Sequence, residues 1–215
     1  MIWIAIGTVA VLSGCGAGVA PGGGSLSGGF TPNYLGDLGG DVARWSGRGV
    51  TVSATVGAEG VSESDLQALV GEAARRWNAA QDEVSVSVVP GGSADVNLTF
   101  APPSDPDLQG RVIGVTTRTY RSQSPVAKML SARIKIETGL GSDARLAVVA
   151  HELGHALGIG GHSASGDDLM YPAPASRAQP TEDDANTLRS IYAARAVKTG
   201  RATGEIVSVV TTCGR

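Results

Sequence analysis

Hydrophobic and polar residues alternate along short stretches of the chain, and this two-residue period predicts β-strands with one buried face. The pattern is clearest in residues 84–89, where valines at positions 84, 86 and 88 are separated by serines. Residues 50–56 alternate in a similar way. In all, five strands are expected, covering residues 50–56, 84–89, 95–100, 112–120 and 132–138.

A different spacing, with apolar residues three or four positions apart, predicts two helices that begin at hydrogen-bonding caps. Ser62-Glu-Ser-Asp65 is a capping-box pattern, and the apolar positions within residues 66–77 fall on one helix face. Thr181-Glu-Asp-Asp184 caps a last helix, whose buried face lies within residues 185–192. The acidic residues of that cap also complement the positive end of the helix dipole.

A third helix is predicted from Ala144 to about Leu157, because apolar residues recur at i, i+3, i+4 and i+7 from Leu146 onward. The preceding turn ends at Asp143, a good N-cap, and Gly158 is placed to end the helix. The order of strand, helix, four strands, helix, loop and helix predicts an α/β fold built from layers.

All three histidines of the chain lie between positions 151 and 162, in a segment that begins on this helix. His151 and His155 are one helical turn apart, so both rings project from the same face and can reach one ion. Gly158 can adopt a positive φ, which lets the chain double back and bring His162 to that ion. Three neutral imidazoles leave a fourth position open for water, as in catalytic zinc sites. We therefore expect one catalytic Zn²⁺ bound by these three histidines.

Glu152 is the expected catalytic residue beside this ion. It points about 100° around the helix from His151, so its carboxylate lies near the metal without binding it. There it can accept a proton from water that the zinc acidifies and pass that proton to the leaving amine. The alternative is a site that binds metal without turnover, but a purely structural site has no use for Glu152.

These residues resemble the signature of the matrixin branch of the metzincin zinc metalloproteases, His-Glu-x-x-His-x-x-Gly-x-x-His followed by a Met-turn. Asp168-Leu-Met170-Tyr-Pro172 is similar to the Met-turn, and the resemblance runs from about Arg44 to Ala194. It implies a twisted five-stranded mixed sheet with two helices packed on it, an active-site helix, the Met-turn and a C-terminal helix. It also implies that Met170 forms a hydrophobic floor under the imidazoles, and that the substrates are proteins or peptides.

The chain departs from the matrixin signature in three ways. His162 lies one residue later than the pattern, and the two preceding glycines, Gly160 and Gly161, could absorb that residue as a small bulge. The only cysteine ahead of the domain is Cys15, which implies no metal-blocking latency of the cysteine-switch kind. No histidine remains for a second, structural zinc. Calcium could stabilise the fold instead, although no clean calcium-loop spacing is present.

The resemblance extends to the walls of the substrate cleft. In some metzincin branches a tyrosine two places after the methionine also ligates zinc, and here that place is Pro172. Tyr171 is therefore expected to form part of the pocket wall, or simply to pack, and we assign Tyr171 and Pro172 to substrate binding. The strand at residues 112–120 resembles the edge along which an extended peptide pairs.

Six basic residues and no acidic residue lie between positions 108 and 136. They indicate either the solvated face of two adjacent strands or a bias of the cleft towards acidic substrates. The six residues are Arg111, Arg118, Arg121, Lys128, Arg133 and Lys135.

The N-terminal residues indicate export and a lipid anchor. Residues 1–12 are uncharged and mostly apolar, too short to span a bilayer and long enough for a signal sequence. Leu12-Ser13-Gly14-Cys15 resembles the lipobox of bacterial lipoproteins, in which the cysteine is acylated, and a Gly/Ser-rich tether follows. We expect secretion across the plasma membrane and anchoring to the cell envelope through Cys15. The alternative is a disulfide between Cys15 and Cys213, the only two cysteines.

Composition supports one folded domain with extensions. The chain has 215 residues, 42% of them hydrophobic and 17% charged, and a net charge of −3, which gives no indication of nucleic-acid binding. We expect a monomer with a signal peptide at 1–14, a lipidated cysteine and tether at 15–43, a catalytic domain at 44–195 and a tail at 196–215. Residues 205–212 are rich in β-branched side chains, and their pattern leaves open a further strand or a mobile tail. Competing functions are a non-catalytic surface module and a hydrolase of cell-wall amides.

Overall fold

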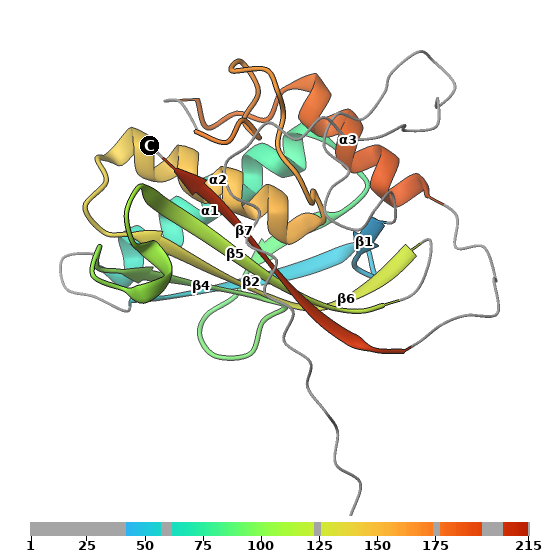
Figure 1. Cartoon of the computed structure of the whole chain (residues 1–215), viewed down its shortest axis with the longest axis horizontal. Coiled ribbons are helices and arrows are strands. Elements are labelled where there is room, and N and C mark those ends of the chain that lie inside the picture. Colours follow the sequence, from blue (N-terminus) through green and yellow to red (C-terminus); the bar gives the residue numbers. More distant parts are fainter. Residues whose placement is uncertain (1–41, 57–61, 123–125, 174–176, 195–203, 215) are drawn as a thin grey trace, which may run out of the picture.

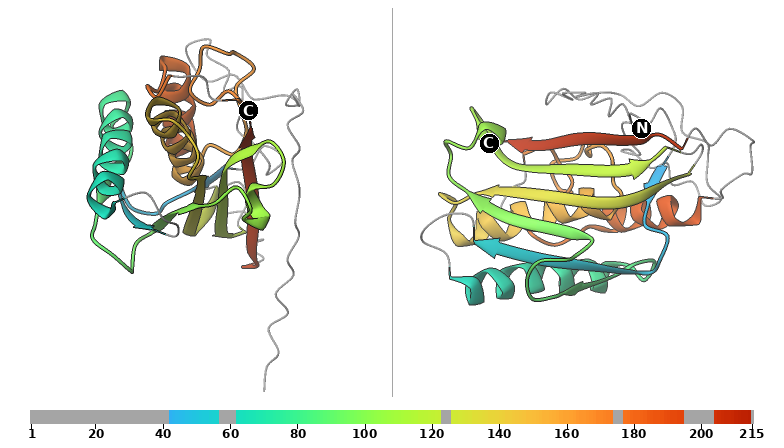
Figure 2. Two further views of the ribbon diagram at one scale, coloured as in Figure 1. Left: turned by 90° about the vertical axis from the view of Figure 1, so that its left-hand side faces the viewer. Right: turned by 90° about the horizontal axis from the view of Figure 1, so that it is seen from below.

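The computed structural model describes residues 42–56, 62–122, 126–173, 177–194 and 204–214. These residues form one mixed β-sheet with three helices packed on the same face of it (Figures 1 and 2). The α/β fold expected from the sequence is therefore confirmed. The strands are β1 (Val42–Arg44), β2 (Gly49–Val56), β3 (Ser85–Val88), β4 (Val96–Ala101), β5 (Val112–Arg121), β6 (Val126–Glu137) and β7 (Ile206–Gly214), and the helices are α1 (Glu63–Ala80), α2 (Ser142–Leu157) and α3 (Glu182–Ala193).

The sheet has the strand order β3-β2-β4-β6-β5-β7, and β1 pairs with β6 beyond this path. Strands β1 to β4 and β6 pair in parallel, whereas β5 runs antiparallel to β6 and β7 antiparallel to β5. The described sheet thus has seven strands and not the five expected. The two additional strands, β1 and β7, come from the ends of the described chain, and residues 206–212 of the undecided segment belong to β7.

The boundaries of two elements also differ from expectation. β6 begins at Val126, six positions before the predicted start at residue 132, because its first residues pair with β1 and with the end of β5. Helix α2 begins at Ser142, and its N-cap is Gly141, so Asp143 lies in the first turn and is not the cap. The carbonyl of Gly141 accepts the first helical hydrogen bond, from the N–H of Arg145 at 2.8 Å.

Capping and core packing explain the position of α1. The hydroxyl of Ser62 accepts a hydrogen bond from the N–H of Asp65 at 3.1 Å, as the capping pattern predicts. The buried face of the helix ends at Trp77, which is fully buried. Its indole N–H donates to the carbonyl of Ala150 at 2.8 Å, so α1 is tied to the middle of α2.

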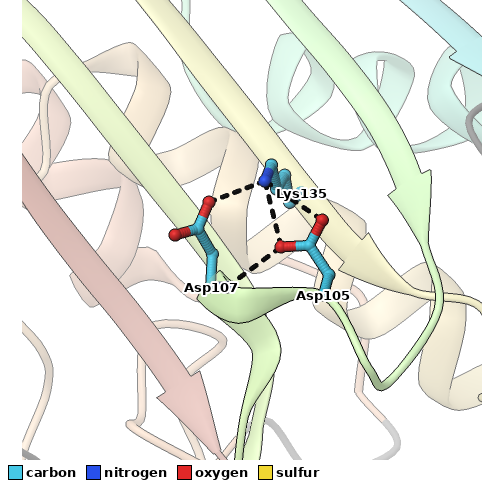
Figure 3. A network of polar contacts seen from close by, with 3 residues as sticks. All are labelled: Asp105, Asp107 and Lys135. Atoms are coloured by element: carbon cyan, nitrogen blue, oxygen red, sulfur yellow. Dashed lines mark hydrogen bonds and ion pairs between the residues drawn. The ribbon is translucent and has the colours of Figure 1, made fainter.

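A network of charged side chains holds the connection between β4 and β5 (Figure 3). The ammonium of Lys135, on β6, lies 3.0 Å from a carboxylate oxygen of Asp105 and 2.6 Å from one of Asp107. The backbone N–H of Asp107 donates to Asp105 as well, at 3.0 Å. Lys135 is therefore paired within the fold, unlike a basic residue on a purely solvated strand face.

None of the helices in the described part of the chain is both long and apolar enough to cross a membrane. The expected signal sequence, Cys15 and most of the expected tether lie outside the described residues.

Candidate metal centre and active site

Helix α2 carries the first two histidines on a face that is removed from solvent. His151 and His155 are both 0% exposed. The Nδ1 atom of His151 lies 2.8 Å from the carbonyl oxygen of Leu169, and Nδ1 of His155 lies 2.7 Å from the carbonyl oxygen of Ile159. Each ring is thus held in orientation by a backbone carbonyl beyond the end of the helix, as is common for histidines that ligate metals.

These hydrogen bonds determine which ring nitrogen carries the proton. A carbonyl oxygen can only accept, so Nδ1 of both rings must donate. Burial is the main cause of a low pKa in both rings, lowering that of His151 to about 3 and that of His155 well below its ordinary value. Both imidazoles are therefore neutral, and each presents an unprotonated Nε2.

The third histidine reaches the same place despite its late position. Gly158 ends α2 with φ 129°, and its N–H donates to the carbonyl of His155 at 3.0 Å. The chain turns back there, and Nε2 of His162 lies 3.3 Å from Nε2 of His155. The extra residue between Gly158 and His162 is thus accommodated in the loop. Burial also lowers the pKa of His162, to about 4.

The convergence of the three imidazoles fits a zinc ion. The Nε2 atoms of His151 and His155 are 3.1 Å apart, and neither has a proton to share, so two lone pairs face each other. A cation between them relieves that repulsion. A tetrahedral zinc with nitrogen ligands at about 2.0–2.1 Å separates those ligands by about 3.4 Å. The ligand atoms of all three histidines lie within 4.8 Å of one another, which is compatible with this geometry.

Glu152 lies next to this cluster and is also 0% exposed. The hydroxyl of Thr116, on β5, donates to its carboxylate at 2.6 Å. Burial raises the pKa of Glu152 to about 7, and hydrogen bonds from Cys213 and Thr116 oppose that rise. A carboxyl group with a pKa near neutrality can both accept and return a proton at physiological pH.

The segment that resembles the Met-turn packs against α2. Met170 is fully buried, and its Sδ lies only 2.5 Å from where a β-carbon on Gly154 would be. Gly154 is on α2 between the two histidine positions, so the methionine lies against the helix backbone there. The N–H of Met170 donates to Asp184 at 3.2 Å, and its carbonyl accepts from the N–H of Ser163 at 2.8 Å. The turn is therefore tied both to α3 and to the loop that carries His162.

Comparison with known families agrees with this geometry. The family model for matrixin matches residues 44–193. The chain belongs to the matrixin family. This family membership supports a metalloprotease with a zinc-binding histidine triad. A comparison with curated protein sequences finds no match.

The remaining expected residues, Tyr171 and Pro172, directly follow Met170 in the chain. Tyr171 and Pro172 are half-buried, and the carbonyl of Pro172 accepts a hydrogen bond from the N–H of Gly214 at 3.1 Å. Among the described residues, a second group of potential ligands consists of His151, Glu152 and Cys213. Neither that group nor the histidine triad is the all-oxygen set that calcium prefers.

The basic set of the matrixin domain does not form one solvated face. Arg118 is 1% exposed, and its Nη2 donates to the hydroxyl of Thr211 at 3.3 Å, beneath β7. The expectation of a solvated strand face is therefore wrong for Arg118. The exposed members of the set are Arg111, Arg121, Lys128 and Arg133.

Three residues that contact the candidate site are not identifiable from local sequence patterns. Thr116 contacts Glu152 because β5 runs beside α2, and Cys213 contacts it because β7 pairs with β5. Asp184 was expected only as part of a helix cap, yet its carboxylate also accepts from the N–H groups of the Met-turn. The pairing of the strands places Thr116 and Cys213 beside Glu152, and local periodicity does not specify that pairing.

Proposed function

We propose that this matrixin domain is a zinc-dependent endopeptidase in which His151, His155 and His162 hold the metal and Glu152 transfers protons. The observation that carries the proposal is the pair of facing, unprotonated Nε2 atoms of His151 and His155, 3.1 Å apart. Such an arrangement is repulsive by itself and favourable around a cation. When bound, zinc supplies Lewis-acid chemistry, polarising a carbonyl group and acidifying water.

The residues of the chain supply the proton transfers. Glu152 accepts a proton from the attacking water and delivers it to the nitrogen of the leaving amine. Burial raises the pKa of this carboxyl above its ordinary value, and a bound zinc ion would lower it again. Thr116 holds one carboxylate oxygen by its hydrogen bond, and Met170 supports the helix under the histidines.

The proposed substrate is an extended segment of a protein or peptide. It would pair with β5 on the side where β7 pairs in this structure, and lie between β5 and the segment Tyr171–Pro172. Main-chain hydrogen bonds along β5 would provide affinity, and the alternate side chains that face α2 would provide selectivity.

The test combines metal analysis with a cleavage assay on a peptide library. Glu152→Ala should abolish cleavage and retain one zinc per chain. His155→Ala should lose both the cleavage activity and the bound zinc. A chain that binds zinc but cleaves nothing in any variant would instead be a binding module. Casein and purified cell wall, each with and without chelator, separate a peptidase from a cell-wall amidase.

We also propose that Cys15 anchors the protein to the cell envelope, on the strength of the lipobox-like segment Leu12-Ser13-Gly14-Cys15. A Gly/Ser-rich tether after the anchor would give the catalytic domain reach from the membrane. Mass spectrometry of the N-terminal fragment should detect acyl chains on Cys15, and Cys15→Ala should release the protein from the membrane fraction.

A further inference from the structure

The C-terminal strand β7 covers the edge of the sheet that the proposed substrate would use. It pairs antiparallel with β5, in a register that runs from Arg121 opposite Ile206 to Val112 opposite Gly214 (Figure 1). β7 also lies outside the part of the chain that matches the matrixin family, residues 44–193. It is therefore an addition to the family domain, positioned on that domain's antiparallel edge.

The backbone of β7 makes contacts on both of its sides. The N–H of Ser122 donates to the carbonyl of Glu205 at 2.7 Å, so Glu205 presents its polar backbone groups towards β5. In an antiparallel ladder every second residue directs its backbone groups the same way. The N–H and C=O of Val209 therefore point towards β5, and those of Val210 point away from it. The backbone groups of Gly214 also point away from β5, and its N–H donates to the carbonyl of Pro172 at 3.1 Å. β7 thus bridges β5 and the segment after Met170, as proposed above for substrate.

The side chains of β7 that face α2 fill the space over the candidate active site. Val209 is 6% exposed, Thr211 4% and Cys213 0%. The Sγ atom of Cys213, a carboxylate oxygen of Glu152 and a ring nitrogen of His151 lie within 4.8 Å of one another. Gly114, opposite Cys213, shows how tight the fit is, since a β-carbon there would lie 2.9 Å from Sγ and 2.6 Å from Oε1 of Glu152.

Solvent is excluded from three of the four residues that would perform the reaction, and the fourth, His162, is half-buried. His151, Glu152 and His155 are all 0% exposed with β7 in place. A general base must reach the water that it deprotonates, within about 2.6–3.2 Å. A peptide cannot pair with the edge of β5 while β7 already does so. The arrangement therefore corresponds to a closed state of the proposed enzyme.

We propose that β7 is an internal peptide ligand of the substrate channel and holds the protease inactive until the strand is displaced. This inference rests on the proposed function, because the channel is defined by the proposed substrate path. Latency of this kind originates C-terminal to the catalytic domain and differs from a prosegment that precedes it. The β7 sequence also indicates the class of peptide that the channel accepts.

That class is an extended segment with small or β-branched side chains at alternate positions. The buried side chains of β7 are all small, and they belong to Val209, Thr211 and Cys213. A hydroxyl is accommodated beside Arg118, whose guanidinium donates to Thr211. The Sγ atom of Cys213 lies 2.9 Å from where a β-carbon on Gly114 would be, so a small thiol side chain occupies the space that this glycine leaves.

The test is a matched pair of proline substitutions in the full, zinc-loaded chain. Val209→Pro removes an N–H that points towards β5, whereas Val210→Pro removes one that points away from it. Val209→Pro should raise cleavage of a peptide library at least about tenfold, which corresponds to about 1.4 kcal/mol. Val210→Pro should cleave at the wild-type rate. Equal and measurable cleavage rates for the wild type and the folded Val209→Pro chain would overturn the proposal.

A binding assay separates this inference from the proposed function. The probe is a fluorescent synthetic peptide with the sequence of residues 205–214, and thermal unfolding verifies the fold of each variant. The probe should bind Val209→Pro and not the wild type or Val210→Pro. If no variant cleaves any peptide but the probe binds selectively, the protease proposal fails and the internal ligand stands. If the probe does not bind folded Val209→Pro, the internal ligand is disproved.

A second design leaves β7 unaltered, in case Val209→Pro does not fold. A recognition sequence for a site-specific protease is placed within residues 195–203, and the folded chain is cut there. The wild-type strand should then exchange with an excess of the labelled probe, and cleavage activity should rise as the strand is diluted away. A cut chain that retains its strand without exchange would show that β7 is a permanent part of the sheet.

Discussion

The hydroxyl of Thr116 lies 2.6 Å from the carboxylate of Glu152, to which it donates a hydrogen bond, and 3.1 Å from the backbone oxygen of the same residue. Thr116 is on β5 and Glu152 on α2, so the contact joins the sheet to the candidate catalytic helix. Both groups are fully buried. A buried carboxylate with one oxygen held in this way has little freedom to rotate.

Replacing this hydroxyl should reduce turnover without affecting metal binding. Thr116→Val keeps the side-chain shape and removes the donor, so we expect kcat to fall about tenfold, the effect of losing about 1.4 kcal/mol. KM and zinc content should change little. Thr116→Ser, which keeps the donor, should retain most of the turnover. The measurement uses the more active of the wild-type and Val209→Pro backgrounds, and loss of zinc in Thr116→Val would contradict a positioning role.

Substitution by alanine should change the free energy of unfolding in opposite directions at the two glycines within the described helices. Gly71, in α1, has nothing within 4 Å of an added β-carbon, so Gly71→Ala should stabilise the fold by about 0.5–1 kcal/mol. At Gly154, in α2, the β-carbon would lie 2.5 Å from Sδ of Met170 and 2.7 Å from the ring of Trp77. Gly154→Ala should therefore destabilise by about 1–3 kcal/mol.

Denaturant unfolding of the two variants measures these changes. Zinc affinity should fall in Gly154→Ala and remain unchanged in Gly71→Ala, because of these two glycines only Gly154 lies between His151 and His155 and packs against Met170. A stabilised Gly154→Ala variant would show that Met170 can move away at no cost.

The histidine cluster was predictable from sequence because its geometry is mostly local. The spacing of His151 and His155 on one helix determines their common direction, and Gly158 allows the return of the chain to His162. The capping box of α3 was predictable for the same reason. In each of these cases the deciding interactions span only a few residues.

The pairing of β7 was not predictable, because a single sequence contains no information on which strands meet. The β-branched residues at 205–212 are compatible with a strand, but nothing local indicates that Cys213 lies opposite Gly114. The burial of Arg118 follows from the same pairing, since β7 covers it. Five strands were expected because the pattern at β1 is only three residues long and that of β7 is ambiguous.

The ion pairs of Lys135 should make a small contribution to stability that depends on pH. The backbone N–H of Asp107 and the ammonium of Lys135 hold the pKa of Asp105 below its ordinary value of 3.8. A lowered pKa stabilises the fold above that ordinary value, and the contribution is lost as the pH falls through the folded pKa. Because Lys135 is 36% exposed, Lys135→Met should cost only about 0.5–1 kcal/mol at pH 7.

Urea unfolding at a series of pH values measures this contribution. The difference between the wild type and Lys135→Met should be present at pH 7 and should shrink below about pH 4. Arg133→Met is the control, since Arg133 lies on the same strand and is exposed. A difference of the same size at pH 2 and pH 7 would mean that packing of the Lys135 stem, and not its charge, is responsible.

Asp184 and Asp183 occupy the same first turn of α3, but only Asp184 is connected to the Met-turn. The buried carboxylate of Asp184 accepts from the N–H groups of Leu169 at 3.0 Å and Met170 at 3.2 Å. The carbonyl of Leu169 in turn orients His151. Asp184→Asn replaces one accepting oxygen by a donor, so it should lower zinc affinity about tenfold to a hundredfold, as expected for a partner of a ligand. Asp183→Asn removes the same helix-dipole charge and should leave zinc affinity unchanged, and competition with a zinc chelator measures both. Equal affinities in the two variants would show that the Met-turn keeps His151 in place without Asp184.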